Sequence, residues 1–81
     1  QGIADAYFAL GQIYHRGVAV PADAIQAFAV FDVAAQLGHS VSGDWRGMVS
    51  NALSQEQLVK AQKLAAELLA RRPAGALDKL R

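Results

Sequence analysis

The sequence predicts an all-α fold in which short helices form antiparallel pairs. Four segments carry apolar residues at a helical period, glycine or proline follows three of them, and two begin with capping-box patterns. The 81 residues are 53% hydrophobic and 19% charged, a composition typical of one small packed domain and not of a disordered chain.

The bulk properties exclude several classes of function. A net charge of +1 provides no general attraction to nucleic acid or to an anionic membrane. The chain has no cysteine, so disulfides, thiolate metal sites and thiol nucleophiles are excluded. No apolar run reaches the roughly 18 residues that a membrane span requires.

The first helix is expected over residues 3–16 and is closed by Gly17, which we expect at positive φ as a C-terminal cap. Its periodicity divides it into two sides. One side, expected to be buried, carries Ile3, Ala6, Leu10, Ile13 and Tyr14. The other carries Asp5, Phe8, Ala9, Gln12 and Arg16.

The segment 18–22 is predicted to be an irregular connector. Val-Ala-Val is too short for a strand and has no partner strand, and a phosphate loop would need a Gly-Lys-Ser/Thr ending that is missing here. Pro21 resists both a helix interior and a central strand.

The second helix is expected from Asp23, with Gln26 completing a capping box, to about Leu37, where Gly38 stops it. Apolar residues on two sides indicate that it is sandwiched between neighbours. The third segment, 41–52, is the weakest helix, because Gly43 and Gly47 each cost roughly 1 kcal/mol relative to alanine.

The fourth helix begins after Ser54, which forms a capping box with Gln57, and Leu53 and Leu58 have the spacing of a hydrophobic staple. Pro73 and Gly75 end it. Its outer side is predicted to form ion pairs in water, because opposite charges stand four residues apart. These pairs are Glu56–Lys60, Lys63–Glu67 and Glu67–Arg71.

The same patterns predict the core. The centre of the first helix pair is expected to consist of Leu10, Tyr14, Phe28, Phe31 and Ala35. The fourth helix is expected to close against Val30, Val33 and Leu37 through Leu58, Ala61, Ala65 and Leu68.

An internal repeat relates the two halves of the chain. A shift of 31 residues places Asp23 on Ser54 and Gln26 on Gln57, whereas a shift of 36 places Gly11 on Gly47. The difference, 36 − 31 = 5, corresponds to a shorter second connector. Two helix pairs are therefore predicted, the second of them degenerate.

These residues resemble a known family. The pattern Ala6-x-x-x-Leu10-Gly11-x-x-Tyr14-x-x-Gly17-x-x-Val20-x-x-Asp23, followed by Ala27, Ala34-Ala35 and Gly38, is similar to a Sel-like repeat (SLR), a relative of the tetratricopeptide repeat. The resemblance is close over residues 2–38 and loose over 39–71. Ala19 departs from it, because the family usually has a second glycine there.

The resemblance implies an α-solenoid of antiparallel helix pairs. Residues 1–38 would form one pair, with residues 1–2 as the tail of a preceding repeat, so that the chain begins inside an array. Residues 39–72 would be a degenerate capping pair and 73–81 a C-terminal tail. Small residues such as Gly11 and Ala27 would let paired helices approach closely.

No chemistry-bearing motif is found. His15 and His39 lack a metal ligand at helical spacing, and no catalytic-triad, paired-carboxylate or Walker pattern is present. Arg71-Arg72 suits a helix C-terminus better than a phosphate site. We therefore expect no catalytic residues, no cofactor and no metal.

The candidate partner-facing residues are Phe8, Gln12, Arg16 and Trp45. Phe8 lies away from Leu10 and Ile13, so we expect an apolar patch there that meets a preceding repeat, a second copy of the chain or a partner's helix. A singly exposed aromatic without function is the alternative. Trp45 is either a core residue, the favoured interpretation, or a partner-facing anchor.

Two classes of function remain. The first is an interaction or scaffold module that binds a protein or peptide and no nucleic acid, as the resemblance implies, because SLR proteins are typically adaptors. The second is a regulatory or accessory segment of an enzyme whose catalytic domain lies elsewhere. The full-length reading frame would distinguish them. Bacterial SLR proteins occur in cytoplasm and periplasm, and family habit favours the periplasm.

Overall fold

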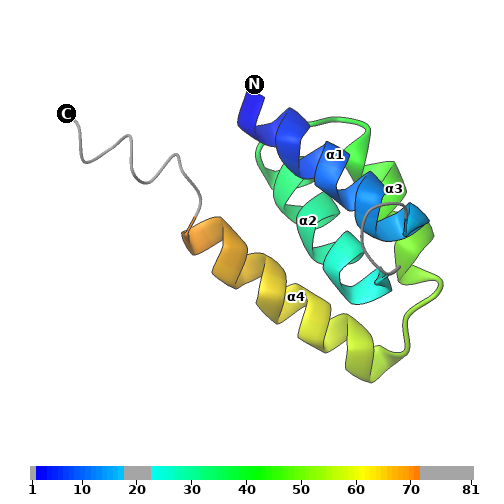
Figure 1. Ribbon diagram of the computed structural model, residues 1–81. Coiled ribbons are helices and arrows are strands. Elements are labelled where there is room, and N and C mark those ends of the chain that lie inside the picture. The colour runs from blue at the N-terminus through cyan, green and yellow to red at the C-terminus, as the bar shows by residue number, and fades with distance from the viewer. Residues whose placement is uncertain (1, 18–22, 72–81) are drawn as a thin grey trace.

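The computed structural model describes residues 2–17 and 23–71, which form four α-helices and no strand (Figure 1). These are α1 (Gly2–Arg16), α2 (Ala24–Gln36), α3 (Ser42–Ser50) and α4 (Gln55–Ala70). The predicted all-α fold is confirmed, the weak third helix included. The predicted connector at 18–22 and tail at 73–81 lie outside the described residues.

Helix α2 is the centre of the fold. It makes the extensive helix contacts with α1, with α3 and with α4, and it lies between α4 and the α1/α3 side of the molecule (Figure 1). Seven of its thirteen residues are buried. The prediction that this helix is sandwiched is therefore correct.

Helices α3 and α4 each pack mainly on α2 and make little contact with each other. A second, separately packed antiparallel pair is thus not evident among the described residues. What the structure shows is an all-helical assembly around α2, and its place in a solenoid of repeats remains a prediction.

Local capping signals determine where the helices begin and end. Asp23 Oδ1 accepts a hydrogen bond from the Gln26 N–H at 3.1 Å, and Ser54 and Gln57 form the reciprocal capping box. Gly17 has φ 69°, as predicted, and its N–H donates to the Ile13 carbonyl at 2.9 Å. The Asp23 N–H donates to the Tyr14 carbonyl at 3.0 Å, which fixes the start of α2 beside the end of α1.

The buried face of α1 is neither of the two predicted sides but lies between them. Ala4 and Gly11 are buried, whereas Leu10 and Ile13 are each 37% exposed. Gly11 lies directly against the Phe31 ring, and Tyr7, Phe8 and Tyr14 on the same face of α1 pack on the core. Leu10 and Ile13 consequently point to solvent, and Leu10 does not belong to the core.

The core consists of two clusters. The first is formed by Ala27, Phe28, Phe31, Val49 and Ala61, with Tyr14 and Leu58 packed against it. The second is formed by Ala29, Val33 and Ala65, with Leu37, Leu64 and Leu68 at its edge. The predicted burial of Phe31 is confirmed, since its exposed fraction is 0%. Of the contacts predicted for α4, Ala65 and Leu68 share the second cluster with Val33 and Leu37. Leu58 and Ala61 instead join the Phe31 cluster, and Val30 is buried but belongs to neither.

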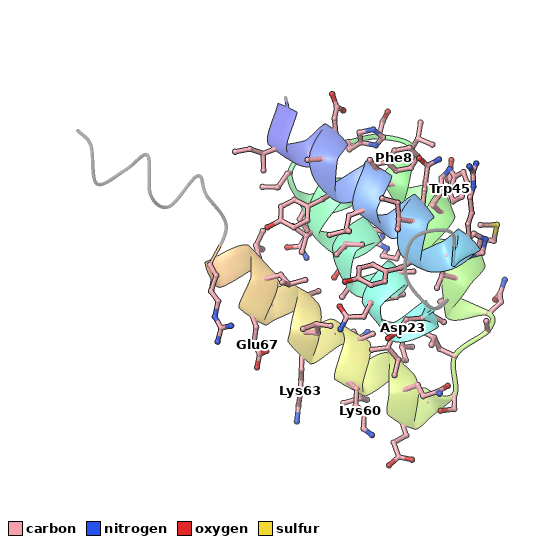
Figure 2. All side chains as sticks on the ribbon, in the orientation of Figure 1. Phe8, Asp23, Trp45, Lys60, Lys63 and Glu67 are labelled. Atoms are coloured by element: carbon pink, nitrogen blue, oxygen red, sulfur yellow. The ribbon has the colours of Figure 1, made fainter. Side chains whose placement is uncertain are left out.

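The charged side of α4 is exposed, and Figure 2 shows Lys60, Lys63 and Glu67 pointing away from the other helices. The predicted ion pairs along it are not formed. Within the described residues there are two such contacts. Arg46 and Asp32 are 2.6 Å apart, and His39 and Asp5 are 3.5 Å apart, a contact that is an ion pair only when the histidine is protonated. Exposed pairs at this spacing contribute only about 0.3–0.5 kcal/mol, too little to hold long side chains in one geometry.

Candidate interaction surface

Two of the four predicted partner-facing residues come together in the structure. Phe8 on α1 and Trp45 on α3 have ring centroids 5.6 Å apart in an edge-on arrangement (Figure 2). Gln12, one turn after Phe8, is half-buried, and Arg16 is exposed at the end of α1. Helix periodicity had already placed Phe8, Gln12 and Arg16 on one side of α1.

Phe8 packs among aromatic rings and does not form the exposed apolar patch expected from the sequence. Its ring stacks on His39 with centroids 4.4 Å apart and lies 5.7 Å from the Phe31 ring. Trp45 also packs on Phe31, at 5.5 Å, and on the edge of His15, at 6.0 Å. Helix α3 therefore covers Phe8. Both rings are half-buried against the core, as the favoured interpretation of Trp45 expected.

Sequence reasoning missed a polar link in which His39 contacts Asp5 and Ser42. The Ser42 hydroxyl is 2.9 Å from His39 Nδ1, and His39 Nε2 is 3.5 Å from Asp5 Oδ1. The order of groups is that of a catalytic triad, but Ser42 has an exposed fraction of 0%, so its hydroxyl cannot reach a substrate. The link instead joins α1 to the start of α3. No group of three histidine or acidic residues within the described parts of the chain could hold a metal ion.

Apolar side chains are exposed on α1 and along α3. On α1 they form what we call the outer α1 face, which consists of Ala6, Ala9, Leu10 and Ile13. Val41, the N-cap of α3, and Met48 within α3 are each 47% exposed, four residues before and three residues after Trp45. Because these spacings place side chains on one side of a helix, we call Val41, Trp45 and Met48 the α3 stripe.

A shallow groove of about 340 Å³ runs between α2 and α4, lined by Asp32, Gln36, Gln62, Ala66, Leu69 and Ala70. The Asp32 carboxylate in it is already occupied. One oxygen accepts from Arg46 at 2.6 Å and the other from the Gln36 amide at 3.3 Å. The carboxylate therefore links α2 to α3 and is not a free ligand for a basic group.

The chain was also compared with known proteins. No model of a protein family matches it, and neither a curated protein nor a solved structure does. Of the helices formed by residues 2–17 and 23–71, none is long and apolar enough to cross a membrane.

Proposed function

We propose that this chain is a protein-interaction module of the SLR type, which binds a protein or peptide along the α3 stripe and performs no catalysis of its own. One observation carries the proposal: Val41 and Met48 are both about half exposed on either side of Trp45, whose ring rests on the buried Phe31. The stripe is therefore apolar and accessible, and the core holds its central ring in place.

The chemistry of the stripe suits a protein partner. Tryptophan and methionine are enriched in protein interfaces, and an aromatic ring held by the core loses little conformational freedom when a partner binds it. Methionine adapts its shape to irregular apolar surfaces. Gln12 and Arg16 lie on the side of α1 that carries Phe8, whose ring contacts Trp45, and they provide polar groups there.

The SLR resemblance supports the same function on separate grounds. Two small residues of the repeat pattern lie in the packed interior: Gly11, where the close approach of Phe31 leaves no room for a side chain, and Ala27, which is fully buried. Proteins built from such helix pairs present extended surfaces to partners.

Site-specific photo-cross-linking in the source cells tests the proposal. A photoreactive residue at Met48 should give a discrete adduct with another protein, and the added substitution Val41→Glu should abolish it. The matched control carries the photoreactive residue at Lys63, on the exposed charged side of α4. Equal adducts from both positions, or an adduct at Met48 that survives Val41→Glu, would contradict binding along the α3 stripe.

A further inference from the structure

The outer α1 face is a continuous apolar surface without a covering element among the described residues. Ala6, Ala9, Leu10 and Ile13 follow the spacing i, i+3, i+4, i+7, so they form one stripe about two turns long. Leu10 and Ile13 are large enough to provide apolar area, and the two alanines let a second helix approach. The α3 stripe is a separate surface on another helix.

Two opposite charges border this face on the same edge. Asp5 and Arg16 are 16 − 5 = 11 residues apart, close to three helical turns, or roughly 16 Å along the axis. The Asp5 side chain is 62% exposed, and within residues 2–17 and 23–71 its one polar contact is that to His39, at 3.5 Å; Arg16 is exposed. Their midpoint falls between Leu10 and Gly11, one residue from the middle of the apolar stripe.

We propose that a second copy of this chain packs on the outer α1 face, with the two α1 helices antiparallel about a two-fold axis near Leu10. This axis brings each Asp5 level with Arg16 of the second copy, and it leaves both charges on the same edge of the contact. Two intermolecular ion pairs then flank one apolar stripe, an isologous interface.

The charge order selects this partner and this orientation. A parallel pair would place Asp5 level with Asp5 and Arg16 level with Arg16, so like charges would be at the same height. A partner helix must carry an acidic and a basic group in reversed order over the same 11-residue span, and α1 itself does so. One helix pair buries less than a standard interface, so the dimer is weak, with a Kd on the order of 100 µM.

Sedimentation equilibrium of the 81-residue chain, from about 10 µM to about 2 mM, measures this association. The wild-type chain should follow a monomer–dimer equilibrium, and Leu10→Glu should raise Kd at least tenfold. The matched control is Val59→Glu on α4, where the replaced residue is also apolar and 45% exposed, and it should leave Kd unchanged. Circular dichroism confirms that each variant stays folded.

A charge exchange tests the orientation. Asp5→Arg and Arg16→Asp should each raise Kd about tenfold, because each creates like-charge contacts in the dimer. The double variant, with the two charges exchanged, should return to within about threefold of wild type. That recovery distinguishes the antiparallel pair from every arrangement in which the two residues do not meet.

Several results would overturn the inference: a chain that stays monomeric throughout, equal effects of Leu10→Glu and Val59→Glu, or a double variant that does not recover. Loss of the dimer through Met48→Glu instead of Leu10→Glu would also overturn it and move self-association to the α3 stripe. The proposed function is tested separately, because an adduct at Met48 with a different protein would persist in a monomeric chain.

Discussion

Gly11 on α1 lies so close to Phe31 on α2 that a Cβ atom at Gly11 would be 2.5 Å from the ring carbon Cε1. Two more atoms of the ring would be within 2.9 Å of it. The ring is fully buried and packed between Phe8 and Trp45, so it cannot move aside easily. The position therefore requires glycine because of space, although its backbone is helical.

Gly11→Ala should lower the free energy of unfolding by about 1–3 kcal/mol, despite the better helix propensity of alanine, because overpacking outweighs that gain. Gly47→Ala is the matched control. A Cβ there meets no atom within 4 Å, so we expect stabilisation of up to about 1 kcal/mol. Urea unfolding followed by circular dichroism measures both. Stabilisation by both substitutions would contradict the close packing of α1 on Phe31.

Phe31→Ala should cost about 3–5 kcal/mol, a large part of the stability of a domain this small, because it removes the ring that joins α1, α2 and α3. Leu10→Ala should cost less than about 1 kcal/mol, since Leu10 lies on the outer α1 face. Thermal unfolding of the two variants beside wild type is the measurement. If Leu10→Ala costs clearly more than about 1 kcal/mol, then Leu10 is buried, as the sequence predicted.

The features that the sequence predicted correctly depend on neighbouring residues. The caps at Asp23 and Ser54 and the positive φ of Gly17 each follow from the chemistry of a few consecutive positions. The buried face of α1 depends instead on a neighbour distant in the sequence. Gly11 lets α1 approach Phe31, and this contact turns inward a face that lies between the two sides defined by periodicity.

In the candidate site, too, features that depend on neighbouring residues could be predicted, and contacts between distant residues could not. Periodicity placed Phe8, Gln12 and Arg16 on one side of α1. It could not indicate that Trp45 of α3 and His39, which precedes α3, would cover Phe8. The contact of His39 with Asp5 joins residues that no local pattern relates. The one signal available was Ser42, three residues after His39 at a helix start, a spacing that favours a local hydrogen bond.

Gly17→Val should destabilise the chain by more than about 1 kcal/mol. At φ 69° a β-branched side chain is strongly disfavoured, and the Gly17 N–H that closes α1 would be displaced from the Ile13 carbonyl. Denaturant unfolding gives the value. A change near zero would show that the end of α1 readily adopts another backbone conformation.

Ser54→Ala should lower the free energy of unfolding by about 0.5–2 kcal/mol, because the alanine cannot accept the Gln57 N–H hydrogen bond, which is 3.1 Å long. The reciprocal bond, from the Ser54 N–H to Gln57 Oε1 at 2.9 Å, would remain available. The loss of stability should therefore correspond to one of the two hydrogen bonds of the capping box and not to both.

Ser50→Ala is its matched control, since that hydroxyl donates only to the Gly47 carbonyl of its own helix, in an exposed position, and we expect a change within about 0.5 kcal/mol. Amide hydrogen exchange locates the effect. Because α4 is held mainly by its contact with α2, loss of the cap should speed exchange in the first turn of α4 and leave α1 unchanged. Equal acceleration in all four helices would mean that Ser54 acts on global stability and not on the start of α4.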